Sequence, residues 1–218
     1  PAANAAIVKA AQLPSDYVIT PEVDSFSASV ESANCIAEER GRELFIRYIE
    51  NVLLQGYKLI QLRTKSLDKE SQVAMTSRVL SLCQQYNAVL MLNSDLRDLL
   101  KGEERCDMSL GLHLTGGSLR RLKEKPSGYR FVAASCHCVD DVFKAEQLGL
   151  EFVTLSPVLK TLSHPEAETL GWDMLAEMVR EARMPVYALG GMTLDSKGQA
   201  LANGAQGIAS IGAYLEFA

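Results

Sequence analysis

The chain has 218 residues, of which 47% are hydrophobic and 22% are charged, an ordinary composition for a globular protein. This composition excludes a disordered chain, which lacks the apolar surface needed to offset chain entropy. The net charge of −5 gives no basic surface for nucleic acid, and no apolar run approaches the roughly 20 residues of a membrane helix. We therefore expect neither a nucleic-acid partner nor a membrane.

The cysteines and the first residues bear on location and domain organisation. Five cysteines form an odd set without paired spacing, which favours a reducing, cytoplasmic location over a disulfide scaffold. We expect no signal peptide, because the start lacks a basic segment followed by an apolar one. Residues 1–15 read as the tail of an upstream segment, so the chain would be a fragment or a processed product. We expect one domain over residues 16–218, because no linker divides them.

Short apolar runs alternate with amphipathic stretches along the whole chain. The runs are nearly continuously apolar and rich in Val, Ile and Leu, as are parallel strands that are buried on both faces. They predict eight strands, at residues 17–20, 58–63, 88–93, 110–114, 131–135, 152–156, 186–189 and 207–211.

The stretches between these runs have the period of amphipathic helices. Asp68 and Thr193 predict helix starts, whereas Gly56 and Gly149 predict helix ends. The polar, Ser-rich stretch 24–34 predicts a long loop after the first strand, and the stretches after the third and fourth strands show little helical pattern. Three apolar stripes mark the clearest helices: Phe45, Tyr48, Ile49, Val52 and Leu53; Met75, Val79, Leu82, Cys83 and Tyr86; and Met174, Leu175, Met178, Val179 and Ala182.

Eight strand–helix units in about 200 residues predict a (β/α)8 barrel, the TIM barrel of the α/β class. The alternative is a doubly wound open sheet, which usually carries a glycine-rich turn after its first strand. Here Thr20 is followed by Pro21, Glu22, Val23 and Asp24, so the barrel is favoured.

In such a barrel, the functional site forms where the strands end. Alternation places Leu59, Gln61 and Arg63 on one face of the second strand and its apolar residues on the other. Because the apolar face suits the helices, Gln61 and Arg63 should point into the mouth of the barrel. Burying these side chains without a partner would be costly, so the simple tendency of strands to end in polar loops explains them poorly. Further polar residues lie at or beyond other strand ends: Asn93, His113, Ser135, His137, Ser156, Thr161 and Ser163.

Two glycine-bearing turns follow the last strands, Gly190-Gly191 after the seventh and Ile211-Gly212 after the eighth. Backbone N–H groups at such turns, with a short helix start, hold phosphate in many barrels. Glycine would let an anion approach these groups, although a tight turn without a ligand also explains it. With Arg63 and Lys65 expected nearby, we favour a small anionic ligand.

The run Cys136-His137-Cys138 has the composition of a metal site without its geometry. Successive strand residues alternate in direction, and no second cluster completes four ligands, so we expect no zinc site. His164, in a polar loop, and Trp172, at a helix start, are explained by solvent exposure and by packing.

Eight segments match a known family pattern in order and spacing. They are YVIT, LIQLRTK, LMLNSD, LGLHLTGG, AASCH, FVTLSPVLKTLSHP, MPVYALGGM and GAQGIASIGAYL. Over residues 16–214 the sequence resembles the thiamine phosphate synthase/TenI superfamily. The segment SPVLKTLSHPEAETLGW is most similar to a subgroup that forms the C-terminal domain of bacterial Nudix hydrolases of the 8-oxo-dGTP diphosphatase type. Residues 1–15 resemble the linker before that domain, and the sequence contains no Nudix box.

The resemblance implies a barrel that binds a thiazole phosphate and, in true synthases, a hydroxymethylpyrimidine diphosphate with magnesium. The Q-x-R-x-K motif that holds the diphosphate matches Gln61, Arg63 and Lys65. His164 stands where the family's T-x-T-K loop has its lysine. The family's other ligand positions match Asn93, Ser135, Thr161, Ser163, Gly191, Ile211 and Gly212.

Two departures from the synthase pattern bear on catalysis. Ser94 and Ser118 stand where synthases have magnesium-binding aspartates. Magnesium prefers carboxylate ligands, so we expect at most weak magnesium binding and weakened diphosphate ionisation. TenI-type tautomerases need no such metal and use a histidine two residues after the serine of strand five, where His137 stands. A neutral imidazole suits proton transfer on a thiazole ring, although a packed mouth residue also explains it.

Two hypotheses follow for function. The first is a superfamily barrel that binds a phosphorylated thiazole-type ligand in thiamine metabolism. The second is a non-catalytic accessory domain of a Nudix hydrolase whose catalytic domain lies outside this sequence. Oligomeric state, including a homodimer, stays open. In the first hypothesis the catalytic candidates are His137, Ser135 and Arg63, and the binding candidates are Gln61, Arg63, Lys65, Asn93, His113, Thr161, Ser163, Gly190, Gly191, Ile211 and Gly212.

Overall fold

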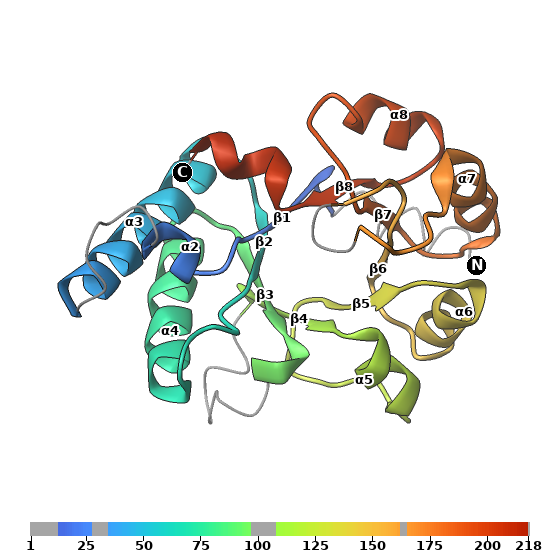
Figure 1. Cartoon of the computed structure of the whole chain (residues 1–218). Helices are drawn as coiled ribbons and strands as arrows, with labels where there is room; N and C mark the ends of the chain where they lie inside the picture. The colour runs from blue at the N-terminus through green and yellow to red at the C-terminus, as the bar shows by residue number, and fades with distance from the viewer. Residues whose placement is uncertain (1–12, 28–34, 97–107, 162–164, 218) are drawn as a thin grey trace.

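The computed structural model describes residues 13–27, 35–96, 108–161 and 165–217. Eight parallel strands close into one barrel in chain order, with the last strand beside the first (Figure 1). The predicted (β/α)8 fold is therefore confirmed, and an open sheet is excluded. The strands match the predicted ones to within a residue at either end: β1 Asp16–Ile19, β2 Leu59–Leu62, β3 Val89–Asn93, β4 Leu110–Leu114, β5 Val132–Cys136, β6 Phe152–Leu155, β7 Val186–Leu189 and β8 Gly207–Ser210.

Side chains along each strand alternate between the barrel interior and the side covered by helices. Leu59 lies in the interior cluster, whereas Ile60 and Leu62 pack in the outer one. The predicted orientation of the second strand is thus confirmed. The interior is filled by apolar and aromatic side chains: Leu13, Tyr17, Ile19, Leu59, Val89, Met91, Phe131, Ala133, Phe152, Tyr187 and Ala209.

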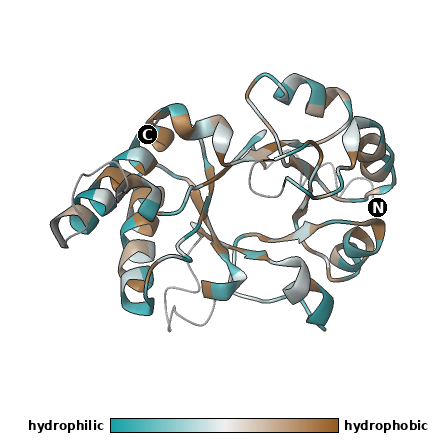
Figure 2. Ribbon diagram, viewed as in Figure 1, coloured by the Kyte–Doolittle hydropathy of each residue, from teal (hydrophilic) through white to brown (hydrophobic). Residues whose placement is uncertain are grey.

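Helices surround the barrel and present hydrophobic and hydrophilic sides (Figures 1 and 2). The two longest, α3 and α4, lie beside the first strands, and their predicted stripes are buried or half-buried. Asp68 caps α4 as predicted, because its carboxylate accepts the backbone N–H of Ser71. The helices are α2 Asp24–Ser27, α3 Cys35–Leu54, α4 Lys69–Gln85, α5 Gly116–Arg121, α6 Val139–Gln147, α7 Gly171–Glu181 and α8 Lys197–Ala202, with 3-10 turns η1 Ser94–Leu96 and η3 Gly212–Phe217.

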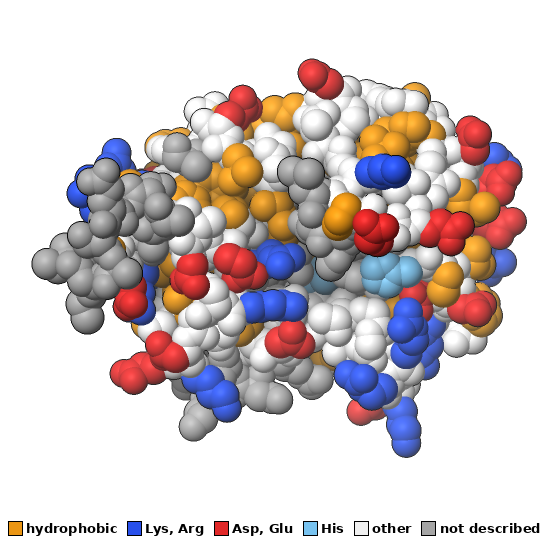
Figure 3. Space-filling view, in the orientation of Figure 1, with side chains coloured by type: hydrophobic (Ala, Val, Ile, Leu, Met, Phe, Trp, Pro, Cys, Tyr) orange, Lys and Arg blue, Asp and Glu red, His pale blue; other side chains and the backbone are white. Residues whose placement is uncertain are grey.

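The surface carries charges of both signs. On the face drawn in Figure 3, Lys and Arg side chains lie among Asp and Glu side chains instead of forming one basic area. Within the described ranges, none of the helices combines the length and the apolar character that crossing a membrane requires.

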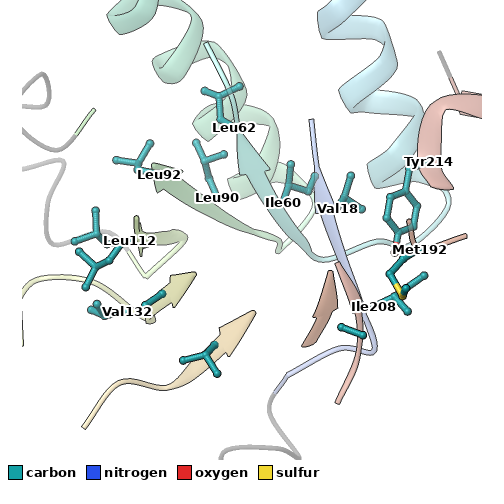
Figure 4. Close-up of a cluster of buried hydrophobic side chains, with 14 of the residues drawn as sticks. Val18, Ile60, Leu62, Leu90, Leu92, Leu112, Val132, Met192, Ile208 and Tyr214 are labelled. Carbon is teal, nitrogen blue, oxygen red and sulfur yellow. The ribbon is translucent and has the colours of Figure 1, made fainter. Parts of the chain in front are cut away.

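The outer core joins the strands to the helices. Figure 4 shows outward side chains of neighbouring strands, such as Val18 and Ile60, pointing into one layer. Tyr214 of η3 is fully buried in this cluster, and its hydroxyl donates to Asp16 Oδ1 at 3.2 Å. Lys197 pairs with the same carboxylate at 3.0 Å, so the first strand is fastened to the last helices.

Several local predictions need correction. Residues 24–27, expected to be loop, form the short helix α2. Met174 is 45% exposed, so it does not belong to the buried stripe of α7. Thr193 accepts the N–H of Ser196 and thus caps a turn before α8 instead of the helix itself. Leu13, which precedes the expected domain start at residue 16, is buried in the barrel interior.

Candidate functional site

The carboxyl ends of the strands bring together four inward-facing polar side chains. Gln61 lies two residues after the interior Leu59 and is 6% exposed. Asn93 and His113 are directly paired across β3 and β4, and His113 bonds to Ser135 of β5. The structure thus places Gln61, Asn93, His113 and Ser135 at one end of the barrel, as the sequence predicts; their roles stay predictions.

A chain of hydrogen bonds crosses the barrel interior from Tyr17 to Ser135. The Tyr17 hydroxyl lies 2.9 Å from His113 Nδ1, and His113 Nε2 lies 2.9 Å from Ser135 Oγ. Tyr17 and His113 are buried, and burial of the imidazole lowers the pKa of His113 to about 3. The ring is therefore neutral at pH 7, with one donor and one acceptor nitrogen.

Two residues of this interior layer, Tyr17 and Thr154, lie before the strand ends and were not predicted as site residues. Thr154 faces inward from β6, paired in register with Ser135 on one side and Tyr187 on the other. Its hydroxyl is buried without a hydrogen-bond partner among the described residues. Alternation finds both residues, because each lies two positions from an interior apolar residue of its strand, Ile19 or Phe152.

Arg63 and Lys65 lie beyond the end of β2, and both are engaged in ion pairs. Arg63 Nε is 3.2 Å from Glu22 Oε1, and Lys65 Nζ is 3.8 Å from Asp95 Oδ2. The backbone N–H of Arg63 also donates to Thr20 Oγ1 at 2.9 Å. A ligand anion at this place therefore has to compete with the two carboxylates.

Ser94 and Ser118, at the positions of the two magnesium aspartates of synthases, lie beside each other. Their hydroxyl oxygens are 3.3 Å apart, and Thr115 contacts both, through its hydroxyl to Ser118 at 3.0 Å and its N–H to Ser94 at 3.3 Å. Hydroxyls are poor substitutes for the carboxylates that magnesium prefers. The described part of the chain contains no group of three or more His, Cys, Asp or Glu side chains able to hold a metal. This donor set does not fit magnesium.

His137 stands at the mouth with its ring exposed, and its Nδ1 lies 2.8 Å from the carbonyl oxygen of Ser156. Because a carbonyl only accepts, Nδ1 carries a proton, so any proton transfer by this ring takes place at Nε2. The backbone N–H of His137 donates to Asp141 at 3.0 Å, and Arg120 donates twice to the same carboxylate at 2.9 and 3.1 Å. Burial would raise the pKa of Asp141, but these hydrogen bonds outweigh it and lower that pKa. The Arg120–Asp141 pair thus fixes the turn that carries His137.

Gly190 and Gly191 have left-handed backbones, with φ of 96° and 67°. A Cβ on Gly191 would lie 2.5 Å from the carbonyl oxygen of Lys160, and one on Gly190 would lie 2.8 Å from Pro157 Cα. The loop after β6 therefore packs against this turn and requires glycine there. Access of an anion to the backbone, the reason expected from the sequence, is not needed to explain the glycines.

The ends of β7 and β8 nevertheless offer backbone donors. In the part of the chain that the structure describes, the N–H groups of Gly191 and Gly212 donate to no acceptor. Both glycines are exposed, and Ile211 packs partly buried against the interior cluster. Thr161 is half-buried after the β6 loop, whereas Ser163 lies outside the described residues.

Comparison with known proteins decides the family. Residues 33–214 match the profile of a family described as thiamine monophosphate synthase. The chain belongs to the thiamine monophosphate synthase family. The match spans β2 to β8 and so includes every strand end described above except that of β1.

Two individual relatives and one solved structure are similar to the chain. A thiamine-phosphate synthase of Limosilactobacillus fermentum is 30% identical over 178 residues, 78% of this chain and 81% of the relative. A relative in Aquifex aeolicus, whose name also refers to thiamine-phosphate synthase, is 34% identical over 180 residues, 80% of this chain and 91% of the relative. Thiamine phosphate pyrophosphorylase of Pyrococcus furiosus has a TM-score of 0.63 at 20% identity, covering 90% of this chain and 84% of that one, which bears on the fold alone.

Proposed function

We propose that this member of the thiamine monophosphate synthase family binds a phosphorylated thiazole in the mouth of its barrel and moves a proton on the thiazole ring without a metal. One observation carries the proposal: the mouth combines the imidazole of His137, whose Nδ1 lies 2.8 Å from the Ser156 carbonyl oxygen, with a pair of hydroxyls where a metal-dependent synthase needs carboxylates. A thiazole phosphate presents both an anion and a ring proton, so it fits the two parts of this site.

The phosphate would bind at the adjacent ends of β7 and β8. Leu189 pairs with Ala209, so the turns that follow these residues are neighbours. The N–H groups of Gly191 and Gly212 have no partner within the described residues, and such groups hold anions well in barrels. Arg63 lies near the end of β2, beside Glu22, and would contact only a second anionic group such as a diphosphate.

The proton step would use His137 as a general base and then as a general acid. Nε2 takes a proton from a ring carbon, and the electron pair of the broken C–H bond stays on the thiazole. His137 exchanges this proton with water, since its ring is exposed, and then gives a proton to a different ring atom, so no oxidant, reductant or leaving group is needed. Because Nδ1 donates to the Ser156 carbonyl, the imidazole keeps one orientation through both transfers.

Two substitutions at Gly212 test the phosphate contact. Gly212→Pro removes the N–H at the first position of η3, where proline is tolerated, and Gly212→Ala keeps it. A Cβ at Gly212 meets nothing within 4 Å, so the Cβ of either variant fits without a clash. By calorimetry we expect G212P to bind hydroxyethylthiazole phosphate roughly tenfold more weakly and G212A to bind it like the wild type, with no difference for the unphosphorylated alcohol. Equal affinities of the two variants would refute the contact.

Exchange of ring protons with deuterated water tests the reaction. NMR of hydroxyethylthiazole phosphate should show exchange with the wild type and a rate lower by about 10²–10⁴ with H137Q. Arg63→Ala should spare this ligand and weaken only diphosphates. If the wild type bound no phosphorylated thiamine precursor, the hypothesis of an accessory domain of a Nudix hydrolase would take precedence.

A further inference from the structure

The hydrogen bonds from Tyr17 through His113 to Ser135 determine which atoms of this series carry the protons. Tyr17 is fully buried, and among the described residues its hydroxyl has His113 Nδ1 as its hydrogen-bond partner, at 2.9 Å. Ser135 is half-buried at the mouth, so its hydroxyl has room for a partner other than His113. The Tyr17 hydroxyl therefore needs His113 as the acceptor of its proton, whereas the Ser135 hydroxyl does not.

Only one tautomer of His113 satisfies all three groups. If Nδ1 carried the proton and donated to Tyr17, the Tyr17 proton would be buried without an acceptor among the described residues, a substantial loss of stability. If Nε2 carries the proton, Tyr17 donates to Nδ1 and Nε2–H donates to Ser135 Oγ. The second arrangement leaves the Ser135 proton directed away from His113.

We infer that Tyr17 and His113 are positioning residues that hold Ser135 as a hydrogen-bond donor toward the mouth, where it selects a ligand atom that accepts a hydrogen bond, such as a phosphate oxygen or an unprotonated ring nitrogen. Where it concerns the ligand, this inference rests on the proposed function; where it concerns the tautomer, it does not.

The arrangement also excludes a second role for Ser135. A serine nucleophile needs a base that accepts its proton, as in Ser–His pairs. Here Nε2 already carries a proton, and burial keeps the pKa of His113 so low that the ring has little tendency to take another. Ser135 therefore binds and does not attack.

The interior offers a matched control residue for Tyr17. Tyr187 lies in the same aromatic cluster, with its ring centroid 5.7 Å from that of Tyr17, but its hydroxyl donates to the carbonyl oxygen of Pro14 at 2.5 Å. Tyr17→Phe and Tyr187→Phe each remove one buried hydroxyl from this layer, and only the first touches His113.

The first measurement is the nitrogen NMR spectrum of the histidine rings in the ligand-free protein. We expect His113 to show a protonated Nε2 and an unprotonated Nδ1, with the Nδ1 signal moved by Y17F and unmoved by Y187F. A protonated Nδ1 in the wild type overturns the inference, as does an Nδ1 signal that Y17F leaves in place. The wild-type spectrum alone decides the tautomer should Y17F fail to fold.

The second measurement is the affinity for hydroxyethylthiazole phosphate. We expect S135A and Y17F each to weaken binding by roughly tenfold or less, and Y187F to leave it unchanged. Wild-type affinity in S135A overturns the donor role of Ser135. If the wild type itself does not bind this probe, the proposed function fails while the tautomer result stands on the spectrum.

Discussion

The buried imidazole of His113 predicts a specific loss of stability in mild acid. In the unfolded chain a histidine has a pKa near 6.5, whereas burial lowers the pKa of folded His113 to about 3. Between these values the unfolded state binds a proton that the folded state does not. Stability from the neutral ring is therefore fully present above pH 6.5 and is lost as the pH falls toward 3.

The size of the effect follows from the two pKa values. Well below pH 6.5, each unit of pH lowers the free energy of unfolding by about 1.4 kcal/mol, and between pH 7 and pH 5 the loss is about 2 kcal/mol. Replacing His113 by Gln, which has both a donor and an acceptor but does not titrate, should remove this loss. The absolute stability of H113Q does not enter the comparison, because only its change with pH is read.

Urea unfolding at pH 7, 6 and 5 measures the change. H113Q should lose about 2 kcal/mol of the pH dependence that the wild type shows between pH 7 and pH 5. If wild type and H113Q lost stability in parallel between pH 7 and pH 5, the His113 imidazole would not be neutral and buried in the folded state, and it would not hold the Ser135 hydroxyl as inferred.

Three further predictions use residues around the mouth. Gly191→Ala should cost about 1–3 kcal/mol in urea unfolding, because of its φ of 67° and the Lys160 carbonyl, whereas Gly212→Ala should stay within about 0.5 kcal/mol; equal costs would contradict the packing of the β6 loop. Asp141→Asn should lower stability at pH 7 by about 1 kcal/mol, since the Arg120 side chain is 58% exposed, and the gap from the wild type should close as the pH falls below about 4. Glu22→Gln should release Arg63 and strengthen pyrophosphate binding measured by calorimetry; an unchanged affinity would show that Arg63 does not contact the diphosphate.

The barrel was predictable because its strands are buried on both faces. Such strands read as short apolar runs, and the ladder that pairs them, from Val18 with Ile60 to Leu189 with Ala209, follows from chain order once the sheet closes. The same alternation that sent Ile60 outward also sent Gln61 to the mouth. Met174 shows the limit of periodicity, because an apolar residue at the margin of a helical stripe lies in solvent when its neighbour Leu175 takes the buried position.

The pairing of charges and protons was not predictable from the sequence. The sequence shows that Arg63 follows a strand, but it does not show the partner of Arg63. Only the fold brings Glu22, which is 41 residues away along the chain, to 3.2 Å from Arg63. Tyr17 and His113 are 96 residues apart, and the hydrogen bond that fixes the tautomer depends on both lying in one layer of the interior. The local sequence pattern does not show which residues make such contacts, because the contacts form only when the barrel closes.

The interior layer itself favours a ligand-binding role over a purely structural one. A buried polar group stabilises a core only when all its partners are present, and apolar residues of similar volume usually serve stability as well or better. This barrel keeps Tyr17, His113 and Ser135 in a connected series that ends at the open mouth, and it buries the Thr154 hydroxyl beside them without a described partner. Stability alone gives no reason for that arrangement. A ligand that accepts a hydrogen bond from Ser135 would explain the arrangement, because it completes the last hydrogen bond of the series where the barrel meets solvent.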